Sequence, residues 1–136
     1  MSRRVVAYVI VTAAAAALVA APTFAKEGVV ARVLTPIERD AQAGTKLTVV
    51  WTLSSVEGGK RRPFGAGGVF IRLFGADGAR SPRVYASQIG SGRYRAQVRV
   101  HRGGVQRVVI GLMSMRCAGS CRPAPRLFPL VGAVFR

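Results

Sequence analysis

The segment Gly92-Arg93-Tyr94-Arg95-Ala96-Gln97-Val98-Arg99-Val100 decides the fold class of this 136-residue chain. Apolar residues occupy every second position from Tyr94 to Val100, and arginine or glutamine occupies the positions between them. A period of two is typical of a β-strand with one face in a core and the other in water. We therefore predict a half-buried strand over residues 93–100.

Six further runs of apolar or alternating residues are separated by glycine or proline at close spacing. They are residues 29–34, 45–53, 69–74, 83–86, 106–112 and 130–135. No segment after residue 26 has a helical period of useful length, and residues 57–68 read as a long mobile loop. We predict an all-β fold, an antiparallel β-sandwich of about seven strands in one domain over residues 26–136, with Trp51 in its core.

The predicted strand that follows residues 93–100 must place its apolar residues on the same core. Pairing Val98 with Val108 does so and leaves His101–Val105 as the loop. This register groups three arginines on the outer face, Arg95, Arg99 and Arg107. Because like charges directly opposite one another destabilise a sheet, these arginines either bind an anion or are solvated side chains that reflect genome composition.

Two aromatic rings flank a cation on the outer side of the strand 69–74, where Phe70, Arg72 and Phe74 alternate with core residues. One expectation is that a loop or the C-terminal segment 127–135 covers them. The other is an exposed apolar patch for a partner.

Turn glycines and one strand tyrosine carry a resemblance to a known family. They are Ala43-Gly44-Thr45, Gly75-Ala76-Asp77-Gly78, Gly92-Arg93-Tyr94-Arg95-Ala96 and Gly103-Gly104-Val105. Over residues 43–112 the chain resembles exported bacterial immunoglobulin-like domains, nearest the YtkA-like group. The resemblance implies an immunoglobulin-like β-sandwich that serves as an envelope protein or accessory module, sometimes near copper handling, and it implies no catalytic residue.

The N-terminal segment has the parts of a secretory signal peptide in the right order: a cationic start, an apolar run over residues 5–21 and the exit Thr23-Phe24-Ala25. We predict a helical signal peptide over residues 1–25 and cleavage before Lys26. The protein is then periplasmic or secreted, with no stable membrane span. The alternative is an uncleaved membrane anchor, and the export route, general secretory or twin-arginine, stays open.

The chain is strongly basic, with 21 Lys plus Arg against 5 Asp plus Glu. Such a field attracts polyanions and is screened by salt. In an exported protein the available polyanions are envelope phosphates, acidic polymers and anionic lipids. The expected partner is therefore an envelope polyanion or an unidentified envelope protein, and not nucleic acid.

The two cysteines, Cys117 and Cys121, are predicted to form a disulfide, because they are an even pair in an oxidising compartment and the residues between them are small. The alternative is a copper site, because thioether and thiolate sulfur suits Cu(I). Its candidate ligands are Met113, Met115, Cys117, Cys121 and His101. The cysteine spacing also resembles that of Sco-type copper chaperones, although this chain has neither the downstream histidine nor the thioredoxin-like pattern of that family.

Residues suited to acid–base or nucleophilic catalysis are scarce. His101 is the one histidine, the five carboxylates show no paired spacing, and no serine lies in a nucleophile motif. We therefore predict a non-enzyme without a cofactor, an exported binding or structural module of the cell envelope. Copper handling and adhesion to envelope polyanions are the alternatives.

Overall fold

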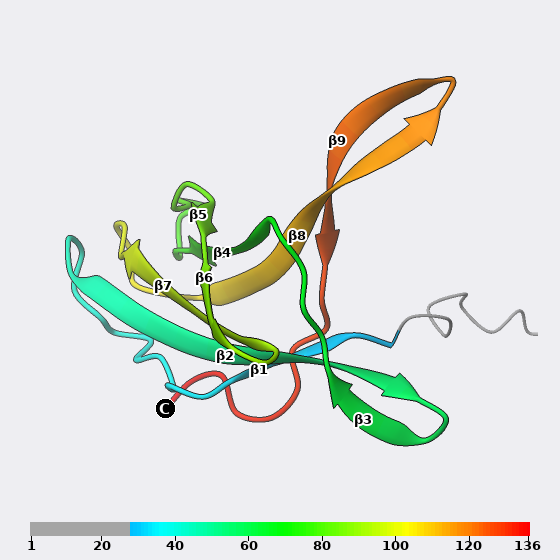
Figure 1. Ribbon diagram of the computed structural model, residues 1–136. Coiled ribbons are helices and arrows are strands. Elements are labelled where there is room, and N and C mark those ends of the chain that lie inside the picture. The colour runs from blue at the N-terminus through cyan, green and yellow to red at the C-terminus, as the bar shows by residue number, and fades with distance from the viewer. Residues whose placement is uncertain (1–27) are drawn as a thin grey trace, which may run out of the picture.

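The computed structural model describes residues 28–136, so the predicted signal peptide over residues 1–25 lies outside the described residues. Every regular element of the described part is a β-strand, and the strands form two antiparallel sheets (Figure 1). No helix that could cross a membrane occurs between residues 28 and 136. The predicted all-β class is confirmed.

One sheet has five strands arranged around β2. Its members are β1 (Val30–Val33), β2 (Lys46–Glu57), β3 (Lys60–Pro63), β6 (Ser87–Gly90) and β7 (Arg93–Arg99). The order is β1-β2-β7-β6, and β3 pairs with the far part of β2. β2 is therefore the central strand of this sheet, because β1, β3 and β7 all pair with it.

The other sheet has four strands in the order β5-β4-β8-β9. They are β4 (Val69–Phe74), β5 (Val84–Tyr85), β8 (Arg107–Ala118) and β9 (Ser120–Leu127). After β5 the chain passes through Ala86 into β6 and so changes sheets. The described residues thus form nine strands, where the sequence predicted about seven.

The core lies between the two sheets, and the predicted inward faces are confirmed. Trp51 and Tyr94 are both almost completely buried, and their rings stack with centroids 6.2 Å apart and planes at 20°. Val98 joins them from β7, while Ile71 and Ile110 are buried from the opposite sheet. The alternation in the segment 93–100 therefore identified the buried face correctly.

The predicted pairing of residues 93–100 with residues 106–112 is wrong. β7 pairs with β2 through seven register positions and with β6 on its other side, whereas β8 pairs with β4 and β9. Val98 and Val108 are both buried in the same core, but they enter it from opposite sheets. The hydrophobic pattern fixes which side of a strand is buried, and both arrangements satisfy it.

The loop between β7 and β8 crosses from one sheet to the other because two other loops hold its backbone. Ala76 N–H donates to the Gly103 carbonyl at 3.3 Å, and Val105 N–H donates to the Arg39 carbonyl at 3.0 Å. Gly103 and Gly104 both have positive φ, and a side chain at either would meet backbone atoms of those loops. This local packing replaces the hairpin that the sequence predicted.

Residues 57–68, predicted as a mobile loop, begin with a hairpin that joins β2 to β3. Its turn residues are Gly58 and Gly59, with φ of 56° and 75°. Positive φ at both central residues is what a two-residue type I′ turn requires, and Gly-Gly is one of its preferred sequences. The prediction missed β3 because all its residues are exposed and mostly charged, so no alternation marks it.

β9 is an edge strand that the sequence analysis did not predict, because proline within a run argues against a strand. Pro125 pairs with Met113, whose own N–H points the other way and donates to the Gly68 carbonyl at 3.0 Å. The missing N–H of Pro125, and of Pro123 two residues earlier, therefore faces the free edge of the sheet. Proline is tolerated at such positions.

The strand predicted over residues 130–135 is also wrong. Leu130 and Phe135 form only isolated parallel bridges, to Ala31 and Ile37. This segment follows the edge of the five-stranded sheet without adding a full strand.

The aromatic rings on the outer side of β4 are covered by other side chains. The prediction that a loop or the segment 127–135 covers them is confirmed in part. Phe70 is buried beneath the ring of Tyr85 and the guanidinium of Arg83, and the guanidinium of Arg107 lies 4.2 Å from the centroid of Phe74. From the C-terminal segment only Leu127 lies on this side, next to Phe70 over Gly111, because Phe128 enters the core instead. Side chains of the sheet itself supply most of the cover.

Candidate anion-binding face

The outer side of the five-stranded sheet carries cations on neighbouring strands. Alternation buries Tyr94, Ala96 and Val98 of β7 and leaves the residues between them exposed. The same alternation on β1 and β2 turns further cations outward. We call this set the arginine face, and its members are Arg32, Lys46, Arg93, Arg95 and Arg99.

The strand register brings like charges together on the arginine face. Lys46 lies directly opposite Arg99, and Arg32 and Arg93 lie on the two sides of Thr52. Like charges placed opposite each other destabilise a sheet unless they splay into water or an anion lies between them. The face therefore has an electrostatic cost that a bound anion would relieve.

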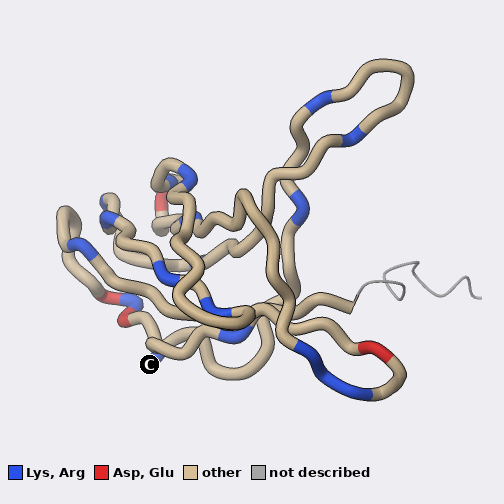
Figure 2. The backbone as a smooth tube through the Cα atoms, viewed as in Figure 1, with Lys and Arg blue, Asp and Glu red and all other residues tan. Residues whose placement is uncertain are grey.

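No carboxylate neutralises this face within residues 28–136. Glu38 pairs with Arg136 at 2.8 Å, and Glu57 lies 3.8 Å from Arg62 at the far end of β2. Asp40 and Asp77 lie in loops. Figure 2 shows the cations distributed over both sheets and the acids confined to loops and one hairpin. The arginine face is thus electropositive throughout.

A shallow hollow of about 440 Å³ opens beside Arg95. Its lining comes from β2, β5, β6 and β7 and consists of Thr48, Tyr85, Ser87, Arg95, Ala96 and Gln97. Three hydroxyls, one amide and one guanidinium provide hydrogen-bond donors, and the lining contains no carboxylate. This donor set suits a phosphate or carboxylate group, because charge-assisted hydrogen bonds to oxyanions are stronger than neutral ones.

The predicted anion-binding set is corrected in one member. Arg95 and Arg99 lie on the outer face of β7 as predicted, but Arg107 begins β8 in the other sheet and stacks on Phe74. The predicted Arg99–Arg107 contact therefore does not form. Lys46 was not predicted as part of this set, because the alternation of β2 marks it as outward but only the pairing of β2 with β7 places it opposite Arg99.

Other arginines serve packing rather than an open surface. The guanidinium of Arg39 lies 3.8 Å from the ring centroid of Phe135. Arg72 donates from Nε to the Ser81 carbonyl at 2.9 Å. Partial burial of Arg72, together with the charges of Arg80 and Arg83, lowers its pKa from the ordinary value. Arg39 and Arg72 are engaged in stacking or hydrogen bonding within the fold, and they differ in this way from the cations of the arginine face.

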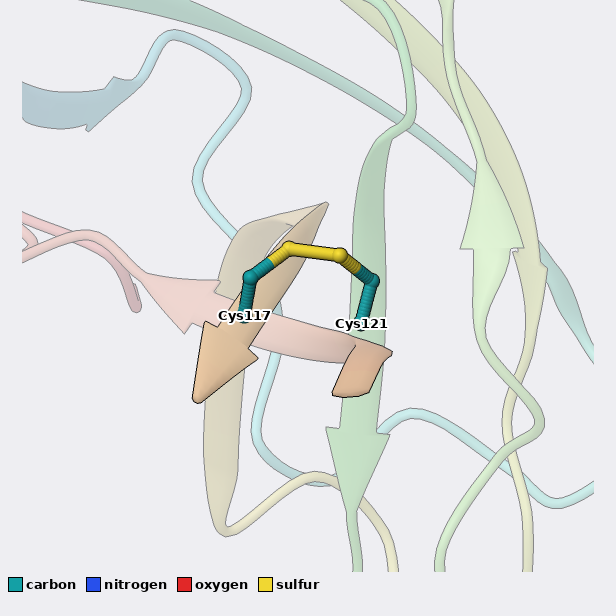
Figure 3. The surroundings of a disulfide bond; sticks show 2 residues. All are labelled: Cys117 and Cys121. Carbon is teal, nitrogen blue, oxygen red and sulfur yellow. A yellow bond between two sulfur atoms is a disulfide. The ribbon is translucent and has the colours of Figure 1, made fainter. Parts of the chain in front are cut away.

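Cys117 and Cys121 are joined by a disulfide across the β8–β9 hairpin, with Cα atoms 4.1 Å apart (Figure 3). The two residues are direct register partners, and Gly119 forms the turn between the strands. A cross-strand pair of this kind brings Cβ atoms close enough for a disulfide. The predicted pairing is therefore observed.

The candidate copper ligands are not brought together as one group. Met113, Met115 and the cysteines lie on the β8–β9 hairpin, whereas His101 precedes β8 at its other end. The ten residue-to-residue steps from Arg107 to Cys117 alone span about 33 Å of extended strand. The sulfur atoms of Cys117 and Cys121 are bonded to each other in the disulfide. The described residues contain no group of three His, Cys, Asp or Glu that could hold a metal ion.

The disulfide predicts that purified, unreduced protein contains no free thiol. Thiol counting under denaturing conditions should give a value near zero, because Cys117 and Cys121 are the only cysteines of the chain. Reduction should restore both thiols. Two titratable thiols before reduction, together with tight stoichiometric Cu(I) binding that is lost in C117S, would contradict this assignment.

Comparisons of the chain with protein-family models, with curated proteins and with solved structures found no match.

Proposed function

We propose that this protein is an exported, non-catalytic binding domain that holds an anionic polymer of the cell envelope against the arginine face. The observation that carries the proposal is the hollow beside Arg95, which offers several hydrogen-bond donors and no carboxylate and lies next to the Lys46–Arg99 pair. Phosphate and carboxylate polymers present repeated oxyanions at spacings that several neighbouring cations can meet. Export is supported by the signal-like segment over residues 1–25.

The fold proposed for residues 26–136 is immunoglobulin-like. Immunoglobulin strands are lettered A to G in chain order. In one sheet, β1, β2, β7 and β6 take the places of strands A, B, E and D. In the other sheet, β4, β8 and β9 take the places of strands C, F and G, with β5 as an added edge strand, and β3 is an insertion. This order supports the resemblance to exported immunoglobulin-like domains that the turn glycines suggest. A sandwich of this type hosts many functions, so the function is argued from the arginine face and not from the fold.

Polymer binding is expected to depend on the position of the cations as well as on their number. The variant K46Q/R95Q/R99Q removes three cations of the arginine face. Its affinity for a short inorganic polyphosphate should fall about a hundredfold, if each cation is worth about 1 kcal/mol at an anionic surface. Calorimetric titration at two salt concentrations measures the affinity, and the dependence of wild-type affinity on salt should be steep.

The matched control is K60Q/R61Q/R62Q, which removes three exposed cations from β3. It loses the same formal charge and should weaken binding only a few-fold, through the general field of the protein. Equal losses from both triple variants would mean that net charge alone attracts polyanions. The arginine face would then have no specific role.

A further inference from the structure

The tip of the β8–β9 hairpin projects away from both sheets (Figure 1). The last register pair of β4 with β8 is Val69 with Leu112, and one further hydrogen bond joins Met113 N–H to the Gly68 carbonyl. Beyond that point β8 pairs with β9 alone. All residues from Met115 to Pro123 are exposed, so this two-stranded ribbon is accessible on both faces.

The projecting ribbon has two chemically different faces. Cross-strand partners share a face and successive residues alternate, so the register assigns every side chain. One face is apolar and sulfur-rich, and it carries the disulfide together with Met113, Met115, Pro123, Pro125 and Leu127. The opposite face carries the charged residues Arg116, Arg122 and Arg126 together with small residues, which are Ser114, Ala118, Ser120 and Ala124.

The apolar face continues onto the body of the four-stranded sheet. Tyr85, Phe70, Gly111 and Leu127 form one row across the four strands. Tyr85, Met115 and Leu127, which are 58%, 61% and 56% exposed, are the three most exposed large hydrophobic residues of the described chain. An apolar surface of this kind on a projecting element marks an interaction site.

The charges of the ribbon indicate the chemistry of its partner. Residues 113–127 contain three arginines and no acid. Arg116 lies directly opposite Arg122, next to the disulfide, so the disulfide holds two like charges close together at the tip. An anionic surface would relieve this repulsion. The combination of an apolar face and a cationic face fits a surface that is apolar at depth and anionic at its boundary.

The edges of the ribbon favour such a surface over an added β-strand. Pro123 and Pro125 remove N–H donors from the free edge of β9, and proline on an edge hinders pairing with another chain. The disulfide ties the two strands together near the turn. The ribbon is therefore suited to insert into a surface as a rigid element rather than to pair with a strand of another chain.

We propose that the β8–β9 hairpin docks on a bilayer of anionic lipid. The apolar face, led by Met115 and Leu127, enters the boundary between headgroups and acyl chains, where amphipathic elements bind. Arg116 and Arg122 stay at the level of the headgroup phosphates, as long cationic side chains do when their stems lie along apolar surface. Apart from Tyr85, which also lines the hollow beside Arg95, this docking site is separate from the arginine face, which lies on the other sheet.

The test is binding to vesicles that contain an anionic phospholipid in a neutral carrier, compared with vesicles of the neutral lipid alone. The variant M115S/L127S should lose affinity for anionic vesicles by about tenfold or more, because it removes two partly exposed apolar side chains. The matched control V56S changes an exposed apolar residue at the end of β2 and should bind as the wild type does. R116Q/R122Q should lose about fivefold per charge, and the control K60Q/R61Q much less.

A second measurement locates the hairpin in the bilayer. The variant M115W adds an indole at the tip, and Trp51 is fully buried and gives a constant background. The added indole should shift its emission to the blue with anionic vesicles and be quenched by brominated acyl chains. The same shift should persist in M115W/K46Q/R95Q/R99Q, which separates hairpin docking from polymer binding at the arginine face.

Three results would overturn the docking proposal. The indole at position 115 could keep its solvent emission on vesicles that carry bound protein. M115S/L127S could bind those vesicles as tightly as the wild type does. The indole could also shift without vesicles as the protein concentration rises, which would identify a second copy of the chain as the occupant of the apolar face.

Discussion

Replacing Trp51 with alanine is expected to destabilise the protein by about 3–5 kcal/mol, the usual cost of deleting a large buried aromatic side chain. Trp51 is 0% exposed on the central strand of its sheet and stacks on Tyr94, so its removal opens a cavity between the sheets. Natural domains are stable by roughly 5–15 kcal/mol, so this loss is a large part of the total. Urea unfolding followed by circular dichroism measures it, because the variant has no tryptophan left to fluoresce.

The matched variant W51F separates packing from the indole nitrogen. Nε1 of Trp51 is buried and has no hydrogen-bond partner among the described residues. Phenylalanine keeps a ring against Tyr94 and removes this unsatisfied donor, so W51F should cost less than half as much as W51A. A loss below about 1.5 kcal/mol for W51A would contradict the placement of Trp51 at the centre of the core.

Replacing Gly104 with alanine is expected to cost about 3 kcal/mol or more, from left-handed strain and a steric clash together. Gly104 has φ of +68°, and an added Cβ would collide with the carbonyl oxygen of Arg39. That carbonyl also accepts the N–H of Val105 at 3.0 Å, so the backbone cannot yield without losing this bond. Thermal or urea unfolding gives the difference from the wild type.

Gly78 is the control for this prediction, because its φ of +70° is nearly the same and an added Cβ would meet nothing within 4 Å. G78A should therefore cost only the strain of the left-handed conformation, about 1–2 kcal/mol. Equal losses in G78A and G104A would show that the loop after β7 is not packed against Arg39. The crossing between sheets would then lack its structural cause.

The sequence predicted buried faces better than it predicted neighbours. The buried face from Tyr94 to Val100 and the core position of Trp51 follow from local pattern, and both are placed correctly. Which strand lies beside β7 depends on contacts between loops distant in the sequence, such as Val105 with Arg39. No local pattern records such contacts, so the hairpin between β7 and β8 was predicted wrongly.

The same limit explains what could be predicted of the candidate site. The outward direction of Arg95 and Arg99 follows from the period of their own strand. Their true neighbour Lys46 comes from β2, fifty-three residues before Arg99, and only strand pairing reveals it. Arg107 was grouped with them because the pairing was wrong. The hollow beside Arg95 needs four strands in place before it exists, so the sequence could not indicate it.

The amphipathic hairpin was hidden for a different reason. Pro123 and Pro125 normally exclude a strand, and they are accommodated here because β9 is an edge. The sulfur-rich run before Cys117 therefore resembled a ligand set, whereas in the folded chain it forms one side of a ribbon.

The central proposal, that the arginine face holds an anionic polymer, is tested most directly by titrating the labelled protein with short polyphosphate and following its backbone amide resonances. We expect the largest shifts at residues 46–48, at Ser87 and at residues 95–99, because these line the hollow and the Lys46–Arg99 pair. Residues 60–62 of β3 should shift little. Shifts spread evenly over all exposed cations, or concentrated at residues 60–62, would contradict the proposal, because the polymer would then follow net charge and not the arginine face.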